Sequence, residues 1–311
     1  YLADVGRRQC DAQQDFVSFA LYICFFPRLL MGPLMSFQEW KKNFDEGKKD
    51  PDLFHRGACC FMLGLAQKVI LSAWMSALFQ TMGDLPLSFV SAWGKSAAFA
   101  LQLYFDFNGY SLMAFGLAAM LDVRIPFNFR GLWFRNYVYI PLGGSRKGNV
   151  RTAFNLLAVW LLTAFWHGST VLFLLWGLYH YCWILAERFL LRQRKRLPNA
   201  VQIILTLCIV VVGWVFFYSK DLPSAFATLR AMADITTVDI PVLSWIFKNY
   251  GTQFIIAAVA CTPLVSKIAE KMSEKNSGFA VLQALCYVLL FTLSLAFLIG
   301  GSYQPFLYSA F

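Results

Sequence analysis

A run of 35 residues without a charged side chain, from Thr152 to Ala186, is the feature that most constrains this chain. An α-helix needs about 20 mostly apolar residues to cross ~30 Å of hydrocarbon. Further uncharged runs occupy residues 200–219, 249–266 and 279–311. With 59% hydrophobic and 14% charged residues, the chain also lies outside the composition of soluble domains. The sequence therefore predicts an integral membrane protein.

Two more apolar segments are each interrupted by one basic residue. Residues 16–37 carry Arg28, and residues 57–80 carry Lys68. A basic side chain is tolerated in a membrane helix when its stem lies along apolar surface or its charge is paired. Both segments are expected to be membrane helices. The fold class is therefore expected to be all-α, a polytopic bundle of membrane helices.

Residues 86–121 are too long for one crossing, and Asp106, Asn108 and Gly109 lie near their middle. Irregular backbone at membrane depth persists only where protein or a wet cavity satisfies its polar groups. We therefore expect a broken or re-entrant pair of helices here.

The connections between apolar runs differ in their content of Lys and Arg. Basic loops of membrane proteins remain on the cytoplasmic side. The basic connections, which we place in the cytoplasm, are 41–56, 124–151, 188–196 and 267–275. The connections poor in basic residues, which we place outside, are 81–87, 220–245 and the tail from Gly301.

The net charge of +10 and the eight cysteines exclude some partner classes. The charge is explained by the cytoplasmic loops and by attraction to anionic lipid headgroups, so membrane lipid is an expected partner. Nucleic acid is not expected, because no soluble binding module or aromatic and basic groove accompanies the charge. The cysteines include no CxxC pair and lie mostly in apolar segments, so no metal site is expected.

His167 lies near the centre of the 35-residue uncharged run. An ionisable group at such depth marks a functional site by default. Histidine titrates near neutral pH and can take a proton from a hydroxyl nucleophile. The alternative is a structural histidine hydrogen-bonded between helices. Gly168 beside it would allow a helix break or a close approach.

Asp106 lies between two phenylalanines and is followed closely by Asn108. A carboxylate is costly in lipid, so it should face the protein interior and accept hydrogen bonds or orient a cation. Lys68 and Lys95 could pair with it or extend to the membrane surface. A structural and a catalytic-support role both remain open.

A basic, aromatic and glycine-rich segment runs from Arg135 to Lys147. Backbone amides at Gly143 and Gly144, with Arg146 and Lys147 nearby, could hold phosphate groups. The segment lacks the spacing of a P-loop, and a membrane-surface anchor is the alternative. His55 and His180 have no obvious partners and are interpreted as structural.

Several ordered phrases together resemble the membrane-bound O-acyltransferase family, in its bacterial polysaccharide branch. The likeness covers nearly the whole chain. The phrases that carry it are Phe25 to Pro33, Tyr104 to Ser111, Tyr137 to Gly144, Trp160 to Gly168, Trp176 to His180 and Tyr303 to Tyr308.

This resemblance implies a single transmembrane acyltransferase domain over 1–311, with a tunnel joining the two membrane faces. It implies that His167 is catalytic, with Asp106, Asn108 and Trp166 in support. Acetyl-CoA is the implied acyl donor, and no resident cofactor is expected. The implied acceptor is an exported, alginate-like polysaccharide or an extracytoplasmic protein that relays the acetyl group. The implied location is the bacterial inner membrane.

Two departures from the family pattern weaken this reading. The family carries further helices before the position of Tyr1. It also carries an Arg-Arg-Trp-His phrase where this chain has only Arg130, Gly131 and Leu132. A transporter or flippase is an alternative, because broken helices with the intramembrane residues Asp106 and His167 also suit a substrate pathway. A non-catalytic scaffold of a polysaccharide-modification complex is another.

Overall fold

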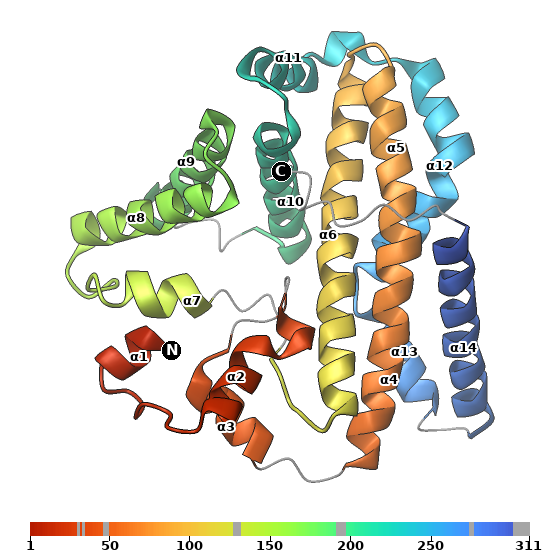
Figure 1. The fold of residues 1–311 in the computed structure, drawn as a ribbon. Coiled ribbons are helices and arrows are strands. Elements are labelled where there is room, and N and C mark those ends of the chain that lie inside the picture. The colour runs from red at the N-terminus through yellow and green to blue at the C-terminus, as the bar shows by residue number, and fades with distance from the viewer. Residues whose placement is uncertain are drawn as a thin grey trace. The chain divides into compact units, whose positions relative to one another are not determined.

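A computed structural model describes residues 1–29, 32, 35–45, 50–126, 132–190, 197–273 and 277–300. Within these residues every regular element is helical (Figure 1). Three helices there are long and apolar enough to cross a membrane: Pro51–Asp84, Asn199–Tyr218 and Gly278–Ile299. They match the predicted segments 57–80 and 200–219 and the described part of 279–311. The all-helical prediction is confirmed.

The chain forms two compact units. The first contains the described residues of Tyr1–Trp74, Gln102–Gly131 and Gln253–Leu307, and the second those of Met75–Leu101 and Leu132–Thr252. The predicted single domain over 1–311 is not tested by this division. The helices are α1 Leu2–Gly6, α2 Phe16–Cys24, η1 Phe26–Arg28, α3 Phe37–Asp45, α4 Pro51–Ala66, η2 Gln67–Leu71, α5 Ser72–Asp84, α6 Phe89–Met120, α7 Leu132–Phe134, η3 Arg135–Tyr139, α8 Asn149–His167, α9 Val171–Leu185, η4 Ala186–Leu190, α10 Asn199–Tyr218, α11 Leu222–Ala233, η6 Ile235–Thr237, α12 Ile240–Ala260, α13 Leu264–Ser273 and α14 Ser277–Ile299.

The predicted membrane helix over 16–37 is wrong. Helix α2 ends at Cys24, and the 3₁₀ turn η1 with Pro27 follows it. Proline has no N–H, and in a continued α-helix its ring would clash with the carbonyl of Ile23 four residues before it, which explains this end. Helix α3 returns to pack with α2 in an apolar core that includes Tyr22, Phe37 and Trp40.

The predicted break within 86–121 is also wrong, because α6 runs continuously from Phe89 to Met120. The polar residues that suggested a break instead bind the neighbouring helix. Lys68 pairs with Asp106, and Asn108 Nδ2 donates to Gln67 Oε1 at 2.7 Å. These contacts are made by side chains, so the backbone of α6 keeps its own helical hydrogen bonds, and Asp106 Oδ2 has no hydrogen-bond partner among the described residues.

Glycines let α4 and α6 approach closely, side by side in Figure 1. A Cβ atom on Gly64 would lie 2.5 Å from the carbonyl oxygen of Gly109, and one on Gly116 would lie 2.5 Å from that of Gly57. Small residues at such contacts are the usual means of packing helices in membranes. We call the facing residues the α4–α6 interface: Gly57, Gly64, Gln67, Lys68 and Ser72 against Gln102, Asp106, Asn108, Gly109 and Gly116.

The wide π-helical turn η2 carries Gln67 and Lys68, which are both buried. Beyond it, Ser72 Oγ donates to the backbone oxygen of Gln102 at 3.3 Å. A π-turn adds about one residue to a helix and is frequent at functional sites. Here it lies where the continuous helix Pro51–Asp84 presents its polar side chains to α6.

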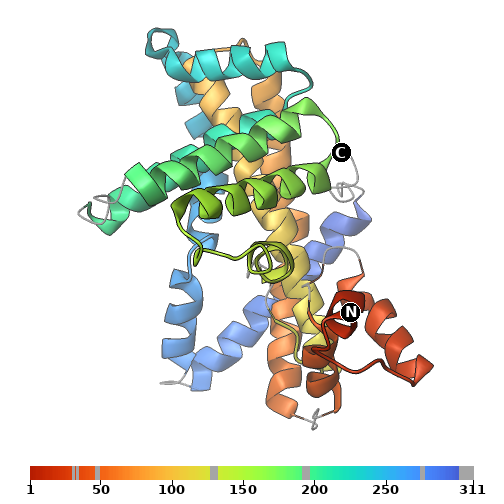
Figure 2. The same cartoon turned by 90° about the vertical axis from the view of Figure 1, so that its left-hand side faces the viewer.

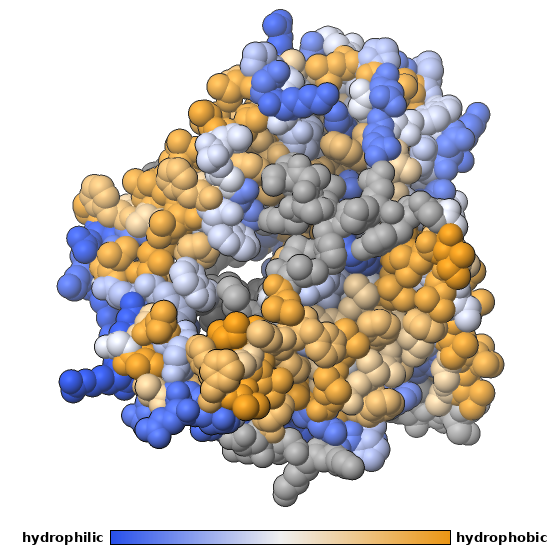
Figure 3. Space-filling view, in the orientation of Figure 1, coloured by the Kyte–Doolittle hydropathy of each residue, from blue (hydrophilic) through white to orange (hydrophobic). Residues whose placement is uncertain are grey.

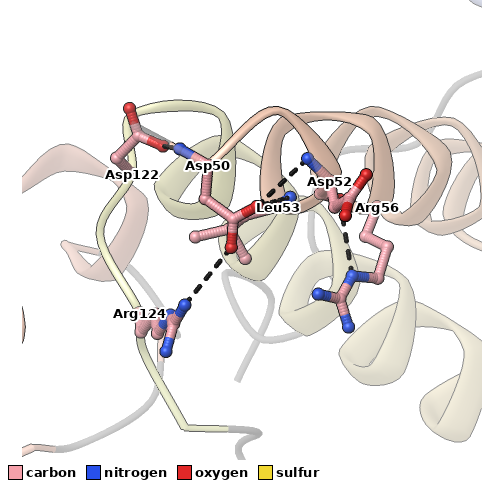
Figure 4. A network of polar contacts seen from close by, with 6 residues as sticks. All are labelled: Asp50, Asp52, Leu53, Arg56, Asp122 and Arg124. Atoms are coloured by element: carbon pink, nitrogen blue, oxygen red, sulfur yellow. Dashed lines mark hydrogen bonds and ion pairs between the residues drawn. The ribbon is translucent and has the colours of Figure 1, made fainter. Parts of the chain in front are cut away.

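A polar network joins the start of α4 to the end of α6 (Figure 4). The Asp50 carboxylate caps α4 by accepting from Asp52 N and Leu53 N at 3.1 and 3.2 Å. It also accepts from Arg124 Nη2 at 3.3 Å, while Asp50 N donates to Asp122 Oδ1 at 3.1 Å. Asp122 has a left-handed backbone, with φ of 58°, and ends α6 in a Schellman turn.

Helix α14 packs on α4 and η2 and exposes apolar side chains along its length. The surface over α14 is accordingly apolar in Figure 3. Such a surface suits contact with lipid. The uncharged run 249–266 does not form one helix, because α12 ends at Ala260 and α13 begins after Pro263.

In the second unit, the 35-residue uncharged run folds as a hairpin of α8 and α9 (Figure 2). The break falls at residues 168–170, directly after His167. Gly177 of α9 permits the close approach, because a Cβ there would lie 2.9 Å from Ala164 Cβ and 3.0 Å from Trp160 O. The helix break that Gly168 allowed is therefore confirmed. Helix α10 packs against α9.

Candidate active site

His167 is the last residue of α8 and is half-buried. Gly168 follows in an extended conformation, and a Cβ on it would lie 2.5 Å from Phe173 Cε2. A larger residue at 168 would therefore displace the Phe173 ring. A hollow that is open to the surface lies at this break, lined by Ala164, Phe165, Gly168, Ser169, Thr170, Val171 and Leu174.

Aromatic rings enclose His167. Its ring centroid lies 5.0 Å from that of Trp176, at an interplanar angle of 80°, and 5.3 Å from that of Phe217. Phe173 lies 6.4 Å from His167 and 4.9 Å from Phe217. These contacts come from α8, α9 and α10, so three helices fix the position of the imidazole. We call the group the aromatic cluster: Trp160, His167, Phe173, Trp176, His180, Trp214 and Phe217.

The two tryptophans near His167 differ in exposure. Trp166, the predicted supporting residue, is 68% exposed, although its ring centroid lies 4.8 Å from that of His167. Trp176 is only 6% exposed, and its ring stacks on Trp214 at 5.9 Å. The resemblance to the family implied Trp166, which directly precedes His167 in the chain. The contact between Trp176 and His167 could not be predicted, because the two residues are nine positions apart across a helix break.

His180 belongs to the same cluster, although the sequence suggested no partner for it. Its ring stacks on Trp160 at 5.3 Å and lies 5.2 Å from Trp176. Gly213 of α10 makes room for it, because a Cβ there would lie 2.7 Å from His180 Nε2. Trp176 therefore contacts both histidines.

The predicted supporting residues Asp106 and Asn108 lie in the first unit, whereas His167 and Trp166 lie in the second. Asp106 is 5% exposed and pairs with Lys68, as one of the two open interpretations of Lys68 predicted. The other predicted cation, Lys95, lies over the rings of Phe79 and Tyr218 at 5.2 and 5.5 Å. A buried charge held by an opposite charge has a structural explanation.

The predicted phosphate loop is held to the start of α8. Asn155 Nδ2, which is buried, donates to Gly144 O at 2.9 Å, and Arg151 Nε donates to Leu142 O at 3.2 Å. The amide of Gly143 donates to Ile140 O and that of Gly144 to Tyr139 O, each at 2.9 Å. Both glycines have a positive φ, as this tight turn requires.

Because those amides already have acceptors, phosphate binding here would depend on the side chains of Arg146 and Lys147, which are exposed. The loop and His167 lie at opposite ends of α8. At 1.5 Å per residue, the 19 residues of that helix span roughly 27 Å. Among the described residues, no group of His, Cys, Asp and Glu side chains could hold a metal ion.

The comparisons with known proteins agree on one family. The model of the membrane-bound O-acyltransferase family matches residues 10–220. The chain is 30% identical to the "Probable alginate O-acetylase AlgI" of Pseudomonas putida over an alignment of 358 residues, which covers 100% of this chain and 72% of the relative. It is 32% identical to the "Peptidoglycan O-acetyltransferase" of Helicobacter pylori, over 74% of this chain and 49% of the relative.

A more distant relative is the "Teichoic acid D-alanyltransferase" of Lacticaseibacillus rhamnosus, 27% identical over 57% of this chain and 53% of the relative. The chain spans about half the length of several of the curated relatives it matches. The family match includes α8, α9 and α10 and therefore the whole aromatic cluster. The chain belongs to the membrane-bound O-acyltransferase family.

Proposed function

We propose that this protein is a membrane-bound O-acetyltransferase that acetylates a hydroxyl group of an exported, alginate-like polysaccharide. The observation that carries the proposal is His167, a half-buried histidine at a helix break, enclosed by rings from three helices of a family-matched segment. A general base needs access to substrate and a fixed orientation, and this position offers both. The relatives named for alginate and peptidoglycan acetylation support an acetyl group as cargo.

In this proposal, His167 takes the proton of the acceptor hydroxyl while its oxygen attacks the acetyl carbonyl. Asp106, Asn108 and Trp166 support the site, the first two by holding α6 against α4 and the third from beside His167. The transfer takes place in a tunnel across the inner membrane. The acceptor is the polysaccharide itself or an extracytoplasmic protein that relays the acetyl group to it.

Acetyl-CoA is the proposed donor, with Arg146 and Lys147 at its phosphates on the cytoplasmic side. Those side chains lie at the opposite end of α8 from His167, so this assignment requires a donor that extends along the helix. The Arg-Arg-Trp-His phrase of the family has no counterpart at 130–132. Residues 127–131 lie outside the described residues, as does the predicted terminal phrase at 303–308.

The experiment compares His167→Gln with His180→Gln in the full-length protein, expressed in a strain that exports the polymer. Loss of a general base typically lowers the rate by about 10²–10⁴-fold. We expect His167→Gln to abolish acetyl ester on the polymer while membrane yield remains near wild type. His180→Gln makes the same chemical change in the same cluster and should retain acetylation.

Normal acetylation by well-expressed His167→Gln protein would contradict the catalytic assignment. If the yield of His167→Gln falls first, the histidine is structural. If polymer export fails while acetyl transfer persists, the protein is a transporter. If acetylation stays at the wild-type level in both variants and still requires the protein to be present, the protein is a scaffold of the modification complex.

A further inference from the structure

The indole N–H of Trp176 is buried without a hydrogen-bond acceptor among the described residues. Its side chain is among the least exposed of the aromatic cluster, at 6%. Buried polar groups are nearly always paired, so each exception requires an explanation. A donor without a partner in the free protein is available to an acceptor that arrives with a substrate.

A second tryptophan shows that burial alone is not enough. Trp40 Nε1 is also buried without an acceptor in the described chain. Its surroundings are the apolar core of α2, α3 and α6, built from side chains such as Tyr22, Phe37 and Ala118. Trp176 differs because its ring contacts His167 at a centroid distance of 5.0 Å.

The position of Trp176 is also tightly fixed. Trp214 stacks on the indole at 5.9 Å, and Trp160, His180 and Phe217 meet it edge to face at 5.8, 5.2 and 5.5 Å. A donor held by surrounding rings needs no reorganisation when charge develops nearby. Its low-polarity surroundings make a hydrogen bond to that charge stronger than in water.

We propose that Trp176 donates its Nε1–H to the carbonyl oxygen of the acyl group during transfer, as an oxyanion donor beside His167. This inference rests on the proposed acetyl transfer. The acceptor oxygen forms a bond to the acyl carbon, its proton passes to His167, and the carbonyl electron pair moves onto the oxygen. Trp176 stabilises that oxyanion. The carbonyl then re-forms, the bond from carbon to the thioester sulfur breaks, and His167 returns its proton to the departing thiolate.

The test uses membranes of the polymer-producing strain, containing the full-length protein, with radiolabelled acetyl-CoA as donor and the resident polymer as acceptor. Trp176→Phe removes the N–H and keeps an aromatic ring. Because the smaller ring leaves space, a second variant replaces the Trp176 indole with its benzothiophene isostere, which keeps the shape and lacks the N–H. Trp40→Phe is the matched control, since it also deletes a buried indole N–H without an acceptor.

Loss of one oxyanion donor typically lowers kcat by about 10²–10³-fold. We expect both Trp176 variants to lose about 10²-fold in kcat while KM for acetyl-CoA changes less than about twofold. The pH at which activity reaches half its maximum should not move, because His167 remains the base. Trp40→Phe should retain wild-type kcat.

Wild-type kcat in the benzothiophene variant would overturn the proposal. It would equally be overturned if the loss appeared in Trp176→Phe alone, because shape and not the N–H would then be responsible. His167→Gln separates this result from the function itself. If His167→Gln is inactive and the Trp176 variants are active, only the oxyanion role fails, whereas an active His167→Gln removes the proposed function as well.

Discussion

In the α4–α6 interface, the buried polar side chains pair with the facing helix, although Asp106 Oδ2 and Gln102 Oε1 have no hydrogen-bond partner in the described chain. In the aromatic cluster, His167 is surrounded by rings. Lys68 and Asp106 neutralise each other, and Gln67 and Asn108 share a hydrogen bond. Trp176 has no acceptor for its N–H in the described chain. The paired polar groups hold two helices together. An unsatisfied donor beside a base, unlike the two unsatisfied oxygens of the α4–α6 interface, is suited to binding something absent from the free protein.

The strongest test of this difference is to break the ion pair. Asp106→Ala leaves Lys68 buried without its counter-charge, and breaking a buried pair typically costs about 3–5 kcal/mol. Asp106→Asn keeps hydrogen-bonding capacity and should lose less. We expect Asp106→Ala to reduce the monodisperse fraction in size-exclusion chromatography far more than Asp106→Asn.

A double variant completes that test. Replacing both partners with Lys68→Met and Asp106→Leu removes the charges together, and such replacements are often neutral. The double variant should recover most of the monodisperse fraction that is lost in Asp106→Ala. If the single and double variants lose the same amount, Asp106 serves something other than pairing with Lys68. Wild-type yield from Asp106→Ala would mean that the carboxylate is hydrated.

A weaker but informative test adds one methyl group to each region. Gly64→Ala would press a Cβ against backbone atoms of α6, 2.5 Å from Gly109 O and 2.8 Å from Met113 N. Gly213→Ala would press against the His180 ring, which can shift. Overpacking typically costs about 1–3 kcal/mol, and we expect Gly64→Ala to lie at the upper end and Gly213→Ala at the lower. Thermal unfolding in detergent measures both, and the reverse order would show that the rings are the more rigid surface.

The smallest expected effect is at the end of the α4–α6 interface. Asp50→Ala removes the cap of α4 and should cost about 1 kcal/mol. Arg124→Ala removes only the exposed ion pair with Asp50, whose value is about 0–1 kcal/mol. The comparison by thermal unfolding separates the cap from the ion pair. A larger loss in Arg124→Ala would mean that the ion pair, and not the cap, holds this end.

Helices α10 and α14 could be predicted from the sequence because hydropathy is a local property of each run. The break after His167 was foreseeable from Gly168. The continuity of α6 was not, because whether Asp106 and Asn108 interrupt a helix depends on Gln67 and Lys68, about forty positions away. Pro27 could have signalled the early end of α2.

The candidate site was partly predictable, because some of its features are local in the sequence and others are not. His167 is conspicuous as the lone ionisable group near the centre of an uncharged run. Trp176 begins one of the phrases that carry the family resemblance, but only the folded hairpin shows that its ring contacts His167. An unpaired N–H is a property of the three-dimensional surroundings and leaves no mark on composition or periodicity.

Because of the wide turn at Gln67–Leu71, the parts of the long helix Pro51–Asp84 before and after the turn differ in rotational phase. A regular helix advances by about 100° per residue, so one extra residue changes which side of the following segment faces a neighbour. Gly57 and Gly64 before the turn, and Ser72 after it, meet α6 together because of that offset. A deletion of one residue within the turn would leave the hydropathy and the cap of the helix almost unchanged. Because the turn already holds the extra residue, the deletion would return it to regular α-helix with Ser72 still facing Gln102, whereas the same deletion elsewhere in the helix would rotate the residues beyond it by about 100°.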